Sequence, residues 1–267
     1  MLIPKTLVVP LDGSRFAEQI LPVASTLAEQ LDADLVLVTA TWDEQDDRDA
    51  AATYLRKVGT ETPARVLDTI VADGPAPIAA ITAAARGGPD RMVCMTTHGR
   101  GRFRWAMIGS VAEGIVSRSD VPLVLAGPRC RAESLQVPGR VVICVDGSDA
   151  SLSVVPHACE WARALHRDIE VAFVGHPLDV EGAAHPDMVL GAVAEQVECE
   201  GVAAHPLLLL STHPAGALVD LAEETSAALL AMTTHTRGGL ARVVLGSVTM
   251  GVLNSAPCPV LVTRPGE

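Results

Sequence analysis

Short apolar runs alternate with longer stretches of helical periodicity along the first half of the chain. The apolar runs, each bounded by turn-forming residues, cover residues 5–11, 35–40, 64–71, 92–95 and 121–125. Between them, apolar residues recur every three or four positions over 14–32, 78–85 and 109–117. This alternation predicts five strands with intervening helices. Because the strands are apolar on both faces, we expect a parallel sheet with helices on each side.

The first predicted helix, over 14–32, contains a proline. Its apolar face consists of Phe16, Ile20, Val23, Leu27 and Leu31. Pro22 lies in the middle of the helix, where a proline removes a backbone hydrogen bond and clashes with the carbonyl four residues earlier. We therefore expect a kink in this helix.

The chain repeats itself. Asp12-Gly13-Ser14 returns as Asp146-Gly147-Ser148, 134 residues later. Residues 95–111 return at 232–248, and residues 121–125 return at 258–262, each 137 residues later. Order, spacing and residue type agree, so the chain holds two tandem copies of one domain.

The predicted organisation is two α/β domains in one chain. We expect the first domain at 1–128 and the second at 140–267, joined by a short polar linker at 129–139. Each domain is expected to be a five-stranded, parallel-sheet, doubly wound domain of the Rossmann-like kind.

The composition is that of an acidic, folded protein. The 267 residues are 49% hydrophobic, and the chain contains three Phe, three Trp and one Tyr, so the core is expected to be aliphatic. A formal net charge of −12 disfavours general binding to nucleic acid. The charge is uneven, because residues 1–132 hold 14 Lys and Arg against 16 Asp and Glu, whereas residues 133–267 hold 6 against 16. A polyphosphate ligand should therefore prefer the first copy.

Other classes of protein are also disfavoured. No apolar run approaches the roughly 20 residues of a membrane span, and the first residues lack a signal-peptide pattern, so we expect a cytoplasmic protein without membrane contact. The six scattered cysteines are interpreted as small buried hydrophobes. The histidines show no metal-ligand spacing, and no P-loop sequence occurs. We interpret the acidic run 43–49 as a solvated, mobile loop.

Two segments of the first copy follow strands whose carboxyl ends are expected at the ligand-binding edge of the sheet. One is Asp12-Gly13-Ser14, and the other is the glycine-bearing loop that ends in Gly109-Ser110. Glycines 99 and 101 permit a close approach of the loop backbone to an anion. Gly109-Ser110 begins a helix whose free N–H groups favour a phosphate.

Neighbouring residues extend this candidate site. Arg100, Arg102 and Arg104 on the same loop can contact further phosphate oxygens. The carboxylate of Asp12 is suited to ribose hydroxyls or to a phosphate-bound Mg²⁺ ion. Thr39 and Ala40 end the second predicted strand, where they are placed to flank a flat base.

These motifs together resemble the universal stress protein family, and the resemblance covers nearly the whole chain twice. The nucleotide-binding branch of that family carries G-x-x-G, nine residues and then G-[S/T]. In the first copy these positions are Thr96, Gly99 and Gly109-Ser110, and in the second copy they are Thr233, Thr236 and Gly246-Ser247. The first copy thus keeps two of the three motif glycines and the second keeps one. Thr236 is β-branched and resists a positive φ.

The resemblance implies an adenine-nucleotide-hydrolase-like fold and an adenine nucleotide as ligand, ATP with or without Mg²⁺. The implied nucleotide-binding residues are Pro10, Asp12, Thr39, Ala40, Thr97, His98, Gly99, Arg100, Gly109, Ser110 and Val111. A second candidate site holds Asp146, Thr234, His235, Arg237, Gly246, Ser247 and Val248. The implied role is regulation or sensing in a stress response. The resemblance also implies that strands 121–125 and 258–262 pair, which makes the two domains an intramolecular pseudo-dimer.

Other interpretations stay open. Asp12 and Asp146 suit a turn without any ligand, and Gly-Ser suits a helix N-terminus without a phosphate. The chain is alternatively a protein-interaction module whose loops no longer bind nucleotide. Under either interpretation, the candidate partners include an unknown protein and a second copy of the chain in a homodimer. His98 and His235 have no visible nucleophile or acid partner, so we expect no enzyme, or at most slow ATP hydrolysis.

Overall fold

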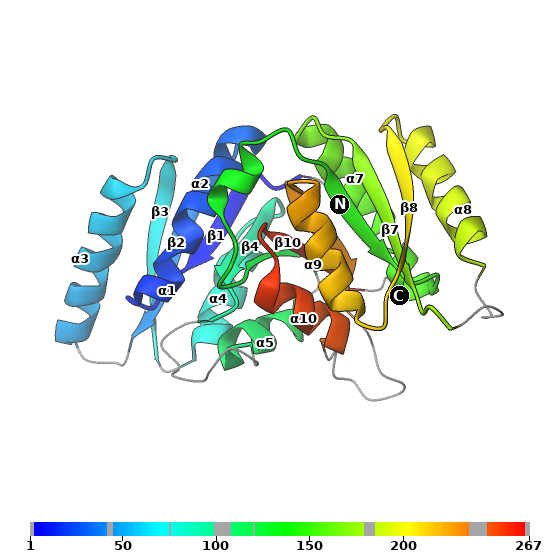
Figure 1. Ribbon diagram of the computed structural model, residues 1–267. Coiled ribbons are helices and arrows are strands. Elements are labelled where there is room, and N and C mark those ends of the chain that lie inside the picture. The colour runs from blue at the N-terminus through cyan, green and yellow to red at the C-terminus, as the bar shows by residue number, and fades with distance from the viewer. Residues whose placement is uncertain are drawn as a thin grey trace.

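The computed structural model describes residues 3–41, 45–74, 76–98, 108–119, 121–178, 185–234 and 245–264 (Figure 1). The first part of the chain forms β1 (Thr6–Pro10), α1 (Arg15–Glu18), α2 (Ile20–Leu31), β2 (Asp34–Thr41), α3 (Gln45–Glu61), β3 (Val66–Asp73), α4 (Pro77–Arg86), β4 (Arg91–Thr96), α5 (Ser110–Val116) and β5 (Leu123–Ala126).

The second part repeats this order after a short connection that contains a 3-10 turn, Ala132–Leu135. Its elements are β6 (Val141–Val145), α6 (Asp149–Leu152), α7 (Val155–Ala164), β7 (Ile169–Gly175), α8 (Pro186–Cys199), β8 (Ala204–Leu210), α9 (Pro214–Glu224), β9 (Leu229–Thr233), α10 (Ser247–Ser255) and β10 (Val260–Thr263).

All these strands form one sheet in the order β3-β2-β1-β4-β5-β10-β9-β6-β7-β8. Pairing within each half is parallel, as the strand-and-helix alternation predicts. The chain leaves β1 toward β2 and β3 and then crosses back to β4, so the strand order reverses between β1 and β4. Ligands of such sheets bind at the carboxyl ends of the strands at this reversal.

The two halves meet through β5 and β10, which pair antiparallel with Val124 opposite Leu261. The connection between the halves also holds them together, because the carbonyl of Leu135 accepts hydrogen bonds from Gln30 in α2 and Arg167 in the second half, at 2.7 and 3.2 Å. One continuous sheet therefore runs through both halves.

Helices cover both faces of this sheet. One buried cluster joins the sheet to α2, α3, α7 and α8, with Leu27, Leu55, Trp161 and Val193 among its members. The other joins it to α4, α5, α9 and α10, with Ile81, Ile115, Leu218 and Val252. Alternate residues of one strand serve the two clusters, so Leu7 and Val9 face one and Val8 faces the other. This explains why the strands are apolar without alternation.

The proline kink is present as a full break. The predicted helix 14–32 divides at Gln19 into α1 and α2, three residues before Pro22. The same break divides α6 from α7 before Pro156. Each break lies where the proline ring would meet the carbonyl of the residue four positions earlier.

The prediction of a loop over 43–49 is wrong for its described part, since α3 begins at Gln45. Acidic side chains in a first helical turn interact favourably with the helix dipole. Further along α3, Leu55 and Val58 lie on one side and are buried against the sheet. Packing of this narrow apolar stripe, rather than the polar composition of the segment, decides its structure.

Two further observations bear on the expected class. Among the described residues, no helix has both the length and the apolar character that a membrane crossing requires. All six cysteines are free thiols, and Cys94, Cys144, Cys159 and Cys258 are buried, as their interpretation as small hydrophobes predicts. Cys130 is half-buried. Cys199 is exposed, however, so the buried interpretation is wrong for that residue.

Candidate functional site

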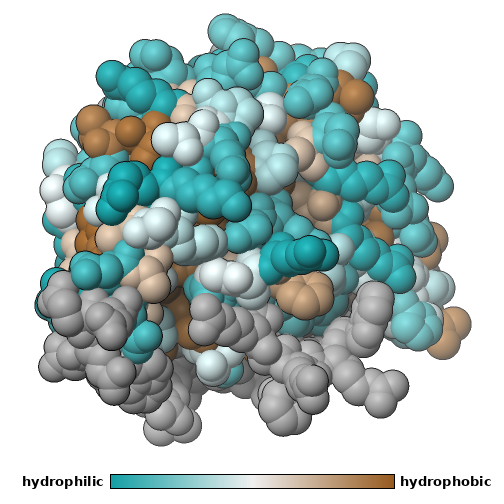
Figure 2. Space-filling model, turned by 90° about the vertical axis from the view of Figure 1, so that its left-hand side faces the viewer, coloured by the Kyte–Doolittle hydropathy of each residue, from teal (hydrophilic) through white to brown (hydrophobic). Residues whose placement is uncertain are grey.

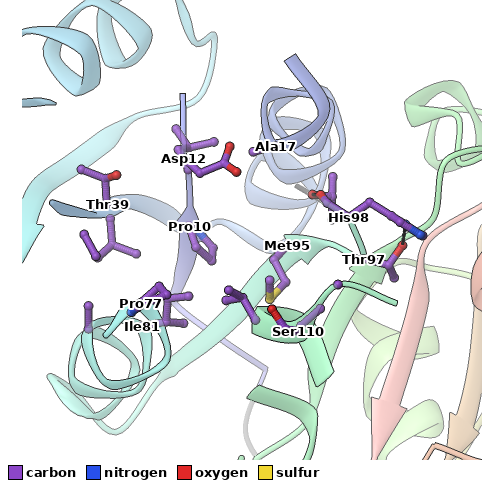
Figure 3. Close-up of a pocket in the computed structure, with 18 of the residues that line it drawn as sticks. Pro10, Asp12, Ala17, Thr39, Pro77, Ile81, Met95, Thr97, His98 and Ser110 are labelled. Atoms are coloured by element: carbon purple, nitrogen blue, oxygen red, sulfur yellow. Dashed lines mark hydrogen bonds between the residues drawn. The ribbon is translucent and has the colours of Figure 1, made fainter. Parts of the chain in front are cut away.

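A cavity of about 660 Å³ opens at the reversal of strand order in the first half (Figure 3). The ends of β1, β2 and β4 form its floor, and the N-terminal ends of α4 and α5 form its walls. The residues that line it are Pro10, Leu11, Asp12, Ala17, Val38, Thr39, Ala40, Pro77, Ala80, Ile81, Met95, Thr96, Thr97, His98, Ile108, Gly109, Ser110, Val111, Ala112 and Glu113.

The turn after β1 places Asp12 at this cavity. The backbone N–H of Ser14 donates to Asp12 Oδ1 at 2.9 Å, and Gly13 takes a positive φ of 77°. Ser14 in turn caps α1, because its Oγ accepts from the N–H of Ala17 at 3.2 Å. The turn interpretation of Asp12 is therefore confirmed, and the same carboxylate also lines the cavity.

A tyrosine supports this turn from outside the cavity. Tyr54 of α3 donates its hydroxyl hydrogen to Glu18 Oε1 of α1 at 2.9 Å. Burial, the hydrogen bond to Glu18 and the charges of Glu18 and Asp12 raise the pKa of this phenol. The sequence analysis missed Tyr54, because its segment was interpreted from its acidic start rather than from its single aromatic residue.

The end of β4 is held by its own hydroxyl groups. Thr97 Oγ1 lies 2.8 Å from Nδ1 of His98, and Thr96 Oγ1 donates to the carbonyl of His98 at 2.7 Å. Thr96 replaces the first motif glycine, yet its hydroxyl is engaged with the backbone and the cavity beside it stays open. The His98 ring is thus oriented by the neighbouring hydroxyl of Thr97.

Helix α5 begins beside this segment. The N–H of Gly109 donates to the carbonyl of Thr97 at 2.7 Å, which fixes the helix start to the end of β4. Gly109 is the N-cap residue, and within the described chain no side chain caps this end. Ser110 and Val111 form the first turn and line the cavity, so their backbone N–H groups lie at its wall.

The remaining wall is apolar and comes from α4. Pro77, Ala80 and Ile81 of α4 line the cavity together with Val38 and Ala40 of β2. Helices α4 and α5 approach closely, because a Cβ on Gly114 would lie 2.3 Å from Ile78 Cδ1. Sequence reasoning missed the α4 residues. Their one signal is Pro77, which follows Gly74-Pro75 and begins the helix after the third strand.

Nine of the predicted residues therefore meet at one cavity: Pro10, Asp12, Thr39, Ala40, Thr97, His98, Gly109, Ser110 and Val111. Gly99 and Arg100, with Arg102 and Arg104, lie outside the described residues. The charged side chains in the described lining are Asp12 and Glu113, and both are acidic. In the described part of the chain, no group of three His, Cys, Asp or Glu side chains is placed to hold a metal ion.

The second half keeps the turn but changes the surrounding side chains. Ser148 N–H donates to Asp146 Oδ1 at 3.0 Å, and Gly147 has a φ of 82°. The strand register places Cys144 where the first half has Pro10, and Phe173 where it has Thr39. Phe173 is 7% exposed and belongs to the buried cluster that packs against α7 and α8.

The other residues of the second candidate site are only partly visible. Thr234 is buried and bonds to the carbonyl of Thr263, and Gly246 is the N-cap of α10. Ser247 and Val248 follow in its first turn. His235 and Arg237 lie outside the described residues. The neighbouring Thr233, at the motif-glycine position, has its Oγ1 3.1 Å from Thr263 Oγ1.

Comparison with known proteins identifies the family to which the chain belongs. The chain matches the universal stress protein family over residues 4–126 and again over 139–264. It is 32% identical over 138 residues to universal stress protein MJ0531 of Methanocaldococcus jannaschii, which covers 47% of this chain and 81% of that protein. It is 27% identical over 241 residues to universal stress protein Rv2005c of Mycobacterium tuberculosis, covering 84% and 78% of the two chains.

A solved structure shares the whole architecture. A universal stress protein from Archaeoglobus fulgidus superposes with a TM-score of 0.77 at 18% identity, over 98% of this chain and 99% of that one. At this identity the likeness concerns the fold. Two matches to the family, the repeated motifs and the shared sheet lead to one conclusion: the chain belongs to the universal stress protein family and consists of two tandem domains of that family.

Proposed function

We propose that the first domain binds an adenine nucleotide, with ATP as the expected ligand, and that the protein acts as a nucleotide-responsive regulatory module. The observation that carries this proposal is the 660 Å³ cavity at the reversal of strand order. Its volume falls in the range of about 300–1,000 Å³ that small-molecule sites occupy. Its lining combines an apolar wall with a few convergent polar groups, which is the usual composition of such sites.

We place the base at the β2 side of the cavity. There Val38, Ala40, Pro77 and Ile81 supply an apolar lining that suits a flat ring. Thr39 offers a hydroxyl at the edge of that space. Asp12 lies between this region and the end of β4, where its carboxylate can accept hydrogen bonds from ribose hydroxyls.

We place the phosphates at the start of α5. The N–H groups of Ser110 and Val111 and the hydroxyl of Ser110 are donors at the cavity wall, and helix N-termini favour anions. The described carboxylates of Asp12 and Glu113 oppose an uncompensated polyphosphate. A Mg²⁺ ion held by the phosphates and one carboxylate resolves this conflict, since Mg²⁺ needs only one or two protein carboxylates. Arg100 is the further candidate for phosphate contact.

The second domain is expected to bind nucleotide weakly or not at all. Phe173 replaces Thr39 beside the expected base position, and the second half carries the larger excess of acidic residues. We propose no catalytic step. Any hydrolysis of ATP is expected to be slow.

The test compares two matched variants. Gly109 and Gly246 are the N-caps of α5 and α10, with φ of −63° and −64°. Gly109→Val places a branched side chain at the proposed phosphate position, and Gly246→Val makes the same change in the second domain. Purified protein is denatured, released nucleotide is identified by mass spectrometry, and ATP with Mg²⁺ is titrated by calorimetry.

The expected result is one site per chain that Gly109→Val abolishes and Gly246→Val leaves intact. Two equal sites per chain contradict the assignment to the first domain. Absence of bound nucleotide and of heat on titration contradicts nucleotide binding and favours the interaction-module interpretation. A phosphate-release assay on the same samples tests turnover, and steady release of phosphate contradicts a purely regulatory role.

A further inference from the structure

The ten-stranded sheet ends in two edge strands that differ sharply. In the described chain, β3 forms one edge and β8 the other, at opposite ends of the sheet (Figure 1). An edge strand presents unpaired backbone groups and is a template for pairing with another strand unless bulges or charges protect it.

The β3 edge is protected. Its pairing with β2 contains a register shift between Leu35 and Val36, which marks a bulge. It also carries the exposed Asp68, and Asp73 forms an ion pair with Arg48 at 2.8 Å. Figure 2 looks onto this end of the molecule, whose described surface is predominantly hydrophilic with scattered apolar residues.

Among its described residues the β8 edge has no bulge and no Asp, Glu, Lys or Arg, and its one protecting feature is Pro206 near the start of the strand. Its sequence from Leu207 to Leu210 is four consecutive leucines, and its register with β7 is continuous. Leu208 and Leu210 are 38% and 66% exposed. Both side chains lie on the same face, next to Gly175, where a Cβ would be 3.6 Å from Leu208 Cδ1 and 3.4 Å from Leu210 Cδ2.

The hydrogen-bond pattern shows which backbone groups of β8 point outward. The carbonyl of Ala203 accepts from Ile169, and the N–H of Ser211 donates to Gly175, so odd-numbered residues face β7. Even-numbered residues therefore direct their N–H and C=O groups to the free edge. Leu208 and Leu210 each present a complete donor and acceptor pair, whereas Pro206 presents a carbonyl without an N–H.

We propose that β8 pairs antiparallel with β8 of a second copy of this chain, around a two-fold axis at Leu209. In this register Leu208 exchanges both backbone hydrogen bonds with Leu210 of the second copy, and the symmetry repeats the exchange. Pro206 falls outside the bonded stretch, so its missing N–H removes nothing. The exposed leucines pack across the strands on one face. The strand thus complements itself, which favours a second copy over an unrelated peptide. The fold already joins two edges antiparallel at β5 and β10.

Negative charge opposes this association and makes it depend on salt concentration. Residues 133–267 hold 6 basic against 16 acidic residues, and the proposed interface brings two such halves together. Salt screens repulsion between exposed charges. Self-association is therefore expected to strengthen as NaCl rises, the reverse of an interface held by ion pairs.

The experiment measures oligomeric state by sedimentation velocity of the full chain over a range of concentrations. Wild type is expected to dimerise, and Leu210→Lys is expected to weaken dimerisation at least about tenfold, since the substitution occurs twice per interface. Leu67→Lys on the β3 edge, where Leu67 is 55% exposed, is the matched control and leaves dimerisation unchanged. A monomeric wild type, or a dimer that survives Leu210→Lys, overturns the proposal.

A cross-link tests the register. Residues opposite each other in a non-hydrogen-bonded antiparallel pair have Cα atoms about 4.5 Å apart, within the range of a disulfide. Leu209→Cys, in a background where the exposed Cys199 is Ser, is expected to form a covalent dimer under a mild disulfide oxidant. Leu207→Cys in the same background stays monomeric on a non-reducing gel. The opposite pattern, or equal cross-linking of both variants, overturns the register at Leu209.

Discussion

Thr39 and Phe173 occupy equivalent positions in the two copies of the repeat, near the end of the second strand of each half. Pro10 pairs with Val38, and Cys144 pairs with Ala172, so the next residue in each second strand is Thr39 or Phe173. The two residues are almost equally buried, at 9% and 7% exposed, but Thr39 lines the cavity of the first half and Phe173 packs into the cluster against α7 and α8. The difference between a hydroxyl and a ring at this position underlies the proposed difference between the domains.

Thr39→Phe is expected to weaken nucleotide binding at least about tenfold, because the ring takes up space in the cavity that the base needs. Calorimetric titration with ATP and Mg²⁺ measures the change. Thr39→Ser keeps the hydroxyl, removes only a methyl group and is the control. Unchanged affinity in the Phe variant would show that the base lies elsewhere.

Substitution of the two turn aspartates, Asp12 and Asp146, is expected to lower stability in both cases but nucleotide affinity in only one. Asp12→Ala removes a hydrogen bond from a serine N–H at 2.9 Å and is expected to lower the free energy of unfolding by about 1 kcal/mol. Asp146→Ala removes the equivalent bond at 3.0 Å and a second one from the Ser148 hydroxyl at 2.6 Å, so the expected loss is about 1–2 kcal/mol. Only Asp12→Ala should reduce nucleotide affinity. Urea denaturation and calorimetry on both variants check this, and equal loss of affinity in the two would contradict a first-domain site.

Glycines in three helices are expected to respond differently to alanine. A Cβ at Gly114 meets the flexible end of Ile78 at 2.3 Å, whereas one at Gly251 meets Ala215 Cβ at 2.6 Å, which cannot rotate away. We expect Gly114→Ala to destabilise by about 1 kcal/mol and Gly251→Ala by about 3 kcal/mol.

Gly191 in α8 is the control, since a Cβ there meets nothing within 4 Å. Gly191→Ala is expected to stabilise by about 0.5–1 kcal/mol through helix propensity. Equal destabilisation of all three variants in urea would contradict the close helix contacts.

Tyr54 predicts a change in stability at alkaline pH. Burial and Glu18 raise its pKa above the ordinary value of 10.0, so the unfolded chain loses this proton at a lower pH than the folded chain. The contribution of protonated Tyr54 to the free energy of unfolding is therefore fully present below pH 10 and is lost as pH rises above it. Tyr54→Phe should show a smaller fall in stability above pH 10 than wild type.

The measurement is direct, because Tyr54 is the only tyrosine in the chain. Tyrosinate absorbance at 295 nm in the folded protein is expected to rise well above pH 10. A rise centred at pH 10 in folded protein would contradict the bond to Glu18.

Local patterns in the sequence predicted most of the fold. The repeat of Asp12-Gly13-Ser14, the apolar runs and Pro22 predicted the tandem domains, the parallel strands and the helix break, because each depends on neighbours along the chain. Motifs at strand ends also placed Asp12, Thr39, Ala40, Gly109 and Ser110 at the candidate site, and the family resemblance added Pro10, Thr97, His98 and Val111.

The structure of α3 and the positions of the α4 residues and Tyr54 depend on packing between distant parts of the chain, which local patterns do not predict. Leu55 and Val58 make α3 a helix through contacts with the sheet, which outweigh the polar character of the segment. Pro77 and Ile81 reach the cavity because β4 lies beside β1, a neighbour relation that no local pattern specifies. Tyr54 supports the turn after β1 from a helix more than 30 residues away in sequence.

The antiparallel meeting of β5 with β10 has an evolutionary consequence. When identical subunits join through one strand, every mutation falls on both ligand sites at once. Here Val124 meets Leu261 within one polypeptide, so each site mutates alone while the junction is kept. One domain can therefore change its site residues without changing those of the other, as the exchange of Thr39 for Phe173 at equivalent positions illustrates.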